Sequence, residues 1–251
     1  MQPSKKFLLT FSIFVVLFII FLALLPQKTN HTPLPKQNIT QNAIPVPTIQ
    51  PKVSAKLFKG NFHTHTEFLH ALSSYDEIIK KAVELKLDFI VITDHDKVLP
   101  EVASRCPVEV NLLCLIGEEV STSNGHLLAV GIKSAIRAGL PSSETIDLIH
   151  DQDGAAIAAH PTGAGGFSKQ VLEAVKDKLD GLECDNARNR KSMNLPFLRS
   201  FAIVNNLGCV YDSDAHSKEQ LAFLVSNCQM ESLSFENLKT AVRSKSCQPS
   251  S

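Results

Sequence analysis

Nine side chains that can bind metal ions are spread along this 251-residue chain, most of them close to the ends of short apolar runs. They are His63, His65, His70, His95, Glu119, His126, His160, Asp214 and His216. Neutral imidazole and carboxylate together suit borderline divalent metals such as zinc, manganese or iron. One mononuclear site needs three or four ligands, so this set suits two or three metal ions with open positions. Such a cluster can bind phosphate oxygens and lower the pKa of a bridging water.

Acidic residues beside these candidates leave some roles open. Asp94 and Asp96 flank His95, where they either orient a ligand imidazole or cap the following turn. The first of these roles would make Asp94 a catalytic residue. Glu118 and Glu119 are adjacent, and side chains alternate between the two faces of a strand, so only one of them can enter a site.

A second group of polar residues follows the run GLEC: Asn186, Arg188 and Arg190. A guanidinium at this position can hold a substrate phosphate through paired hydrogen bonds, which would give Arg188 both a binding and a catalytic role. The alternative is a set of solvated loop residues. The glycine-rich stretch 163–166 lacks a following G-K-[ST], so it is more typical of a flexible turn than of a phosphate loop.

Strand-like and helix-like runs alternate from residue 62 onward, and these elements must position the candidate residues. Apolar and β-branched runs predict strands at 62–66, 87–93, 110–117, 126–132, 155–160, 180–184, 208–213 and 221–226. Helical periodicity predicts helices at 74–85, 142–152, 168–178, 192–206 and 234–244. Ser74 and Glu77 form a capping box at the first helix. This alternation predicts a parallel α/β sheet, open or closed into a barrel, whose strand ends meet at one face.

The N-terminal part of the chain differs in composition from the rest. After a short tail, 1–6, residues 7–25 are almost wholly apolar and uncharged, and about 20 such residues cross a bilayer as a helix. We interpret them as a transmembrane anchor, with a cleaved signal peptide as the alternative. Residues 26–56 are rich in Pro, Asn, Gln and Thr and predict a disordered linker. Residues 57–251 suffice for one catalytic domain.

The charge pattern and the cysteines bear on location and partners. Lys5 and Lys6 precede the apolar stretch, so the positive-inside tendency predicts a single-pass protein with its catalytic domain outside the cytoplasm. The formal net charge is zero, and no basic run indicates nucleic-acid binding. The six cysteines permit disulfides in an oxidising compartment. Sequence proximity favours the pairs Cys106–Cys114 and Cys228–Cys247, whereas Cys184 and Cys209 lie in apolar runs typical of buried thiols.

The ordered motifs FHTHTEFLH, KLDFIVITDHD, GEEVST, GHLLAVGI, AAHP, GLECDN and DSDAHS resemble those of the polymerase and histidinol phosphatase (PHP) family. The resemblance covers about residues 62–217. It implies a distorted (β/α)7 barrel that holds two or three divalent metal ions and hydrolyses phosphoesters. All nine candidates match metal-ligand positions of the family, and Glu119 matches the bridging carboxylate.

Motifs and composition together predict a membrane-anchored, metal-dependent phosphoesterase acting on a small phosphorylated substrate. The expected reaction is attack on phosphorus by a metal-bridging hydroxide. Two alternatives stay open: a metal-dependent hydrolase of a non-phosphate bond, and a catalytically silent, metal-stabilised binding domain. The oligomeric state cannot be predicted from the sequence.

Overall fold

The computed structural model describes residues 55–66, 71–102, 104–106 and 111–250, all within the unit Pro51–Ser251. The predicted anchor and nearly all of the predicted linker lie outside these ranges. No helix within the described ranges has both the length and the hydropathy needed to cross a bilayer.

The described residues form strands and helices in an order close to the predicted one. The strands are β1 (Lys56–Asn61), β2 (Phe89–Ile92), β3 (Leu113–Thr122), β4 (Gly125–Val130), β5 (Ala155–Ala158), β6 (Gly181–Asn186), β7 (Gly208–Asp212), β8 (Ser226–Met230) and β9 (Cys247–Pro249). The α-helices are α2 (Tyr75–Glu84), α3 (Ser142–His150), α4 (Lys169–Val175), α5 (Leu195–Val204) and α6 (Phe235–Arg243). Two short 3-10 helices are η1 (Pro100–Val102) and η2 (Gln220–Ala222).

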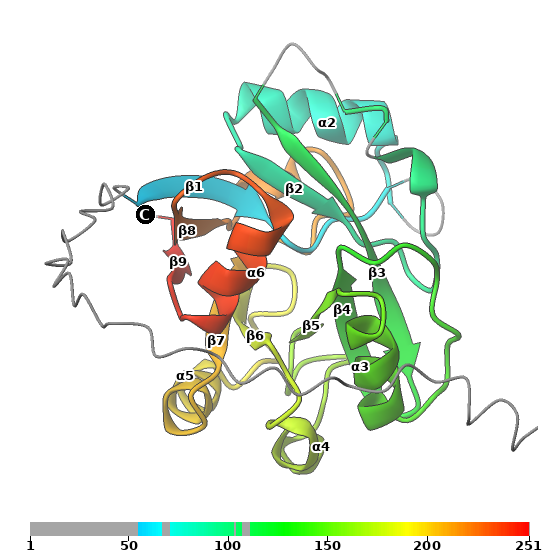
Figure 1. Cartoon of the computed structure of the whole chain (residues 1–251), viewed down its shortest axis with the longest axis vertical. Coiled ribbons are helices and arrows are strands. Elements are labelled where there is room, and N and C mark those ends of the chain that lie inside the picture. The colour runs from blue at the N-terminus through cyan, green and yellow to red at the C-terminus, as the bar shows by residue number, and fades with distance from the viewer. Residues whose placement is uncertain (1–54, 67–70, 103, 107–110, 251) are drawn as a thin grey trace, which may run out of the picture. The chain divides into compact units, whose positions relative to one another are not determined.

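The strands of the described ranges form one curved sheet in the order β7-β6-β5-β4-β3-β2-β1-β8-β9 (Figure 1). Parallel pairing joins β1 to β2 to β3, and again β5 to β6 to β7. The sheet curls so far that residues after its distant strands β1 and β7 meet. Thr64 pairs with Ala215 in a parallel bridge, and the amide of His65 donates to the Ala215 carbonyl at 2.8 Å. The result is a nearly closed α/β barrel.

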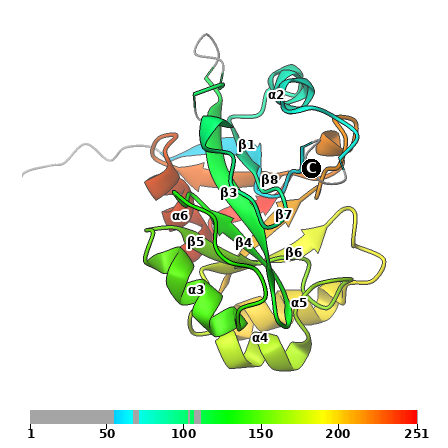
Figure 2. The same ribbon diagram turned by 90° about the vertical axis from the view of Figure 1, so that its right-hand side faces the viewer.

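The sheet departs from the predicted parallel arrangement at β4 and at β8. Strand β4 runs antiparallel to both β3 and β5, because Ser123 and Asn124 connect β3 to β4 in a tight turn that reverses the chain. Strand β8 runs antiparallel to β1 and to β9. Figure 2 shows β3 and β4 as neighbouring strands above α3 and α4.

Several predicted boundaries also shift. The first strand ends at Asn61, so the histidines predicted on it lie in the loop that follows. Residues 221–226 do not form the predicted last strand; they overlap η2, and β8 begins only at Ser226. The capping box at α2 is present as predicted: the Ser74 side chain accepts from the Glu77 amide, and the Glu77 carboxylate accepts from the Ser74 amide.

Three disulfides cross-link the described residues and leave no free cysteine. The pairs Cys106–Cys114 and Cys228–Cys247 are confirmed. The prediction of buried thiols at Cys184 and Cys209 is wrong, since these two residues form the third disulfide. They lie on the adjacent strands β6 and β7 with a Cα–Cα distance of 5.2 Å, which suits a disulfide although 25 positions separate them in sequence.

Candidate metal centre

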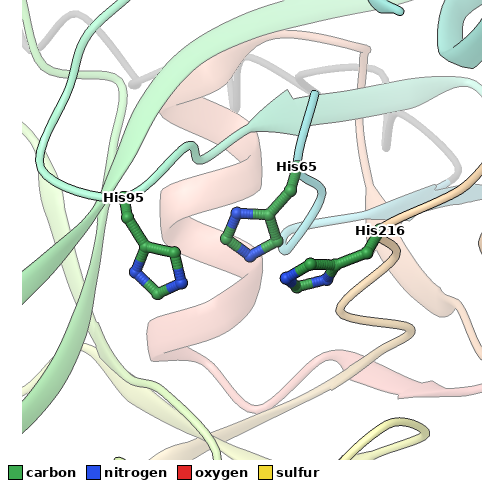
Figure 3. Close-up of side chains that lie close together, drawn as sticks. All are labelled: His65, His95 and His216. Atoms are coloured by element: carbon green, nitrogen blue, oxygen red, sulfur yellow. The ribbon is translucent and has the colours of Figure 1, made fainter. Parts of the chain in front are cut away.

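The predicted metal-binding side chains gather where the strands of the barrel end. They are His63, His65, His95, His160, Asp214 and His216 from the loops, and Glu119 and His126 from β3 and β4. In Figure 3 the imidazoles of His65, His95 and His216 face one another, and the ring centroids of His65 and His216 are 4.2 Å apart. The ninth candidate, His70, lies outside the described residues.

The Glu119 carboxylate is the centre of the cluster. Its Oε1 lies 2.8 Å from His126 Nδ1 and 2.8 Å from His160 Nε2. Its Oε2 lies within 3.0–3.3 Å of three further Nε2 atoms, those of His63, His65 and His95. Five imidazoles therefore approach the two oxygens of one carboxylate that is 1% exposed.

Asp214 is the second carboxylate of the cluster. Its Oδ1 lies 3.3 Å from His65 Nε2 and 3.5 Å from His63 Nε2. Its Oδ2 accepts a hydrogen bond from the Asn189 side-chain amide at 2.8 Å. Asp214 has a φ of 52°, a left-handed conformation that is uncommon away from glycine. Strained backbone of this kind recurs at functional sites.

The electrostatics favour ionised carboxylates. Burial acts to raise the pKa of Glu119, but the charge of His63 and the hydrogen bonds from neighbouring histidines outweigh it and hold that pKa well below its usual range. The pKa of Asp214 is lowered in the same way, since His63 and His65 outweigh burial. Conversely, these carboxylates outweigh burial at His63 and raise its pKa well above the usual value.

At the rim of the cluster the histidines favour the neutral form. Burial and the charge of His65 lower the pKa of His216 to about 4. Burial likewise lowers the pKa of His95. Neutral imidazole beside ionised carboxylate is the form in which both groups bind metal ions.

The residues fit divalent cations. Asp214 Oδ1 and His160 Nδ1 are buried without any hydrogen-bond partner, which is costly for a protein unless another ligand satisfies them. Four overlapping triplets of residues each bring three ligand atoms within 4.8 Å of one another. These triplets are His63–His65–Glu119, His63–His160–Asp214, His65–His95–His216 and His95–Glu119–His126. Glu119 belongs to two of these triplets, and a carboxylate shared in this way is typical of sites that bind neighbouring metal ions.

The two adjacent glutamates of β3 point in opposite directions, as strand alternation requires. Glu119 enters the cluster, whereas Glu118 is buried on the other face, where its Oε2 accepts from the Ile136 amide at 2.9 Å. Burial raises the pKa of Glu118 to about 7.

Asp94 holds a loop. Its two oxygens accept from the Thr66 amide and from the Thr66 hydroxyl, both at 2.6 Å, and both residues are buried. It therefore fixes the chain directly after His65, a role different from the imidazole orientation and turn capping considered above. Asp96 accepts from the Ser121 amide at 2.7 Å and thereby connects the loop after β2 to β3.

The three residues predicted to bind substrate occupy different environments. Arg188 lines a cavity of about 270 Å³ together with members of the cluster, among them His126, His160 and His216. Asn186 is fully buried, and its amide donates to Glu183 at 2.8 Å and to Asp214 at 3.4 Å. The Arg190 guanidinium forms two hydrogen bonds of 2.8 Å with the Asp185 carboxylate and does not line the cavity.

The turn at 163–166 packs against the cluster. Ala164 lines the cavity, and Gly165 has a φ of 72°. A Cβ atom added at Gly165 would lie 2.8 Å from His126 Cε1, so only glycine leaves room for this imidazole.

Sequence reasoning missed two residues that contact the cluster, Glu183 and Asn189. Glu183 is fully buried, and its Oε1 lies 2.9 Å from His63 Nδ1. Asn189 lines the cavity and donates to Asp214. Both follow from the position of β6 in the barrel, because its end delivers side chains to the same face as the other strand ends.

Comparison with known proteins identifies a relative and the fold. No family model matches the chain. A stretch of 145 residues is 30% identical to the uncharacterized protein MJ1587 of Methanocaldococcus jannaschii and covers 53% of this chain and 84% of that protein. The chain belongs to the same family as this archaeal protein.

Solved structures show which fold this is. A two-domain protein from Bacteroides vulgatus, containing a predicted PHP-like metal-dependent phosphoesterase, superposes with a TM-score of 0.62 at 14% identity over 90% of this chain and 69% of that one. Endonuclease Q, in complex with a 27-mer duplex carrying an abasic lesion, gives 0.54 at 15% identity over 75% of this chain and 57% of that one. These superpositions confirm the PHP-type fold that the motifs implied.

Proposed function

We propose that this chain is a metal-dependent phosphoesterase. The observation that carries the proposal is the approach of five imidazoles to the buried carboxylate of Glu119, with a second buried carboxylate, Asp214, beside them. A purely structural metal site needs fewer ligands and leaves no open position. This donor set therefore favours catalysis over a metal-stabilised binding domain.

The ligands of the proposed centre are the described members of the cluster together with His70. The centre takes two or three divalent ions of zinc, manganese or iron, for which imidazole and carboxylate are suitable ligands. Glu119 is the shared carboxylate, because it belongs to two of the ligand triplets. When bound, such ions neutralise phosphate oxygens and lower the pKa of a coordinated water.

The chain's own residues orient the substrate and the ligands. Arg188 faces the cavity and supplies a guanidinium that can hold a phosphate through paired hydrogen bonds. Asn186 is buried and bonded to the cluster, so it positions Asp214 and does not touch substrate. Arg190 is held by Asp185, which leaves Arg188 as the substrate-binding arginine of this loop.

The substrate is small. The cavity of about 270 Å³ accommodates a phosphate group and a compact leaving group. Endonuclease Q shows that a related fold acts on DNA, but this chain has a formal net charge of zero and no basic run. Duplex DNA with an abasic site is therefore the comparison substrate, and a carboxylic ester tests hydrolysis of a non-phosphate bond.

The proposed location is the outer face of a membrane. Three disulfides support folding in an oxidising compartment. The apolar stretch 7–25, with Lys5 and Lys6 before it, supports an N-terminal anchor whose catalytic domain lies outside the cytoplasm.

Turnover by the full-length chain tests the proposal. Phosphate monoesters and diesters, abasic duplex DNA and a carboxylic ester are each supplied with manganese or zinc. We expect metal-dependent hydrolysis of a small phosphoester, abolished in Glu119→Gln and retained in Glu118→Gln. Glu118→Gln is a matched control for Glu119→Gln, because both glutamates are buried in β3 but only Glu119 faces the cluster. Equal loss in both variants, or no phosphoester hydrolysis with either metal, would contradict the proposal.

A further inference from the structure

Glu183 connects two separate parts of the proposed metal centre from within the barrel. It lies on β6 and is fully buried, so it cannot touch a substrate in the cavity. Its Oε1 lies 2.9 Å from His63 Nδ1, and its Oε2 accepts from the backbone amide of His160. The Asn186 side chain also donates to Oε2, at 2.8 Å. One carboxylate thus contacts a residue that follows β1, a residue that follows β5 and a residue of its own strand, β6.

The contact with His63 determines which imidazole nitrogen faces the cluster. An ionised carboxylate only accepts hydrogen bonds, so the proton of a neutral His63 ring must be on Nδ1. The Nε2 atom is then left with its lone pair, and this is the atom that lies 3.0 Å from Glu119 Oε2 and 3.5 Å from Asp214 Oδ1. Carboxylates that fix a histidine in this way also increase its basicity as a ligand.

The contact with His160 stabilises a strained backbone. His160 has a φ of 28°, which is unfavourable for a residue with a side chain. The hydrogen bond from its amide to Glu183 offsets part of that cost and helps to direct the imidazole to Glu119 Oε1, 2.8 Å away. The turn that follows fits closely, because a Cβ atom at Gly166 would lie 2.1 Å from the His160 carbonyl oxygen.

We propose that Glu183 is a positioning residue of the metal centre, setting the tautomer of His63 and the backbone of His160 at once. The inference rests on the proposed function. Glutamine cannot replace the carboxylate, because it has one acceptor oxygen and one amino group that only donates. In Glu183→Gln, either the bond from the His160 amide is lost or His63 must take the opposite tautomer.

Zinc affinity tests the proposal. The full-length chain, its Glu183→Gln variant and its Glu118→Gln variant are stripped of metal and titrated with zinc alone against a chromogenic chelator. We expect Glu183→Gln to bind zinc about 10- to 100-fold more weakly, the range typical of lost ligand-orienting carboxylates. Glu118→Gln should bind like the unmodified chain, since it alters an equally buried glutamate that faces away from the cluster.

A measurement on the unmodified chain covers the case in which Glu183→Gln does not fold. Nitrogen-15 NMR of the zinc-loaded chain should show the His63 proton on Nδ1. Equal zinc affinity in Glu183→Gln, or a proton on Nε2 of His63, would overturn the role of Glu183 while leaving the metal centre in place. Failure of the unmodified chain to bind zinc would overturn the proposed function and this inference with it.

Discussion

Asp94 provides the sharpest distinction between a catalytic carboxylate and one that holds the structure together. Its oxygens accept two hydrogen bonds of 2.6 Å from Thr66, and the two residues are 1% and 0% exposed. A hydrogen bond to a charged group contributes about 1.5–3 kcal/mol. Asp94→Ala removes both acceptors and leaves buried donors unpaired, so it should lower the free energy of unfolding by about 3–6 kcal/mol.

Asp94→Asn should be much milder. The asparagine oxygen can accept from the Thr66 amide, and its amino group can donate to the Thr66 hydroxyl, which rotates to accept. Since neutral hydrogen bonds are roughly half as strong as charge-assisted ones, the expected loss is about 1–2 kcal/mol. Thr66→Val, which deletes only the hydroxyl, should cost about 1.5–3 kcal/mol and add little in an Asp94→Ala background.

Urea unfolding and phosphoester turnover of the full-length variants measure these effects. We expect Asp94→Asn to keep most of the activity, and Asp94→Ala to lose activity together with stability. A general acid or base contributes about 10²–10⁴-fold to the rate and cannot be replaced by an amide. If Asp94→Asn folds with near-normal stability but loses activity to that extent, our structural interpretation of Asp94 is wrong.

Three further predictions concern residues outside the cluster. Burial raises the pKa of Glu118 to about 7, above an ordinary value of 4.5, so the folded chain binds the extra proton between these values and stability should fall as the pH rises through them. Glu118→Gln should make the free energy of unfolding depend less on pH over this range. Identical urea midpoints for variant and parent, both at pH 5 and at pH 8, would contradict this prediction. Replacing Cys184 and Cys209 by serine removes the constraint on a 25-residue loop and should lower the free energy of unfolding by about 3.5 kcal/mol, and an unchanged free energy of unfolding would contradict this. Arg188→Ala should lower kcat/KM by about 10- to 100-fold, whereas Arg190→Ala should change it little, and equal effects would exclude Arg188 as the phosphate-binding residue.

The convergence of the candidate ligands could be predicted because parallel strands end at one face. The apolar run before His95 and the run before His160 are short and buried on both sides, so each strand ends within three residues of a side chain that enters the site. Strand alternation also predicted that only one of Glu118 and Glu119 enters the site, and the match to the family motif favoured Glu119. Roles that depend on residue type and position within a strand were therefore accessible from the sequence.

Features that depend on contacts between segments far apart in the chain could not be predicted from the sequence. The disulfide between Cys184 and Cys209 requires knowing that β6 and β7 are neighbours in the barrel. Glu183 was passed over because its partners, His63 and the His160 amide, lie 120 and 23 positions away.

One missed feature had a local signal. The Asn124–Gly125 pair marks the tight turn that reverses the chain after β3, and it could have predicted the antiparallel β4.

Anomalous X-ray diffraction from crystals of the zinc-loaded chain tests the central claim most directly. We expect two or three zinc peaks inside the cluster, with one bound by Glu119 and every peak about 2.0–2.2 Å from imidazole nitrogens or carboxylate oxygens. The peak nearest His63 should lie on its Nε2 side, opposite Glu183. Zinc bound only at surface sites, or no peak within reach of Glu119 and Asp214, would contradict the assignment of a metal centre to this chain.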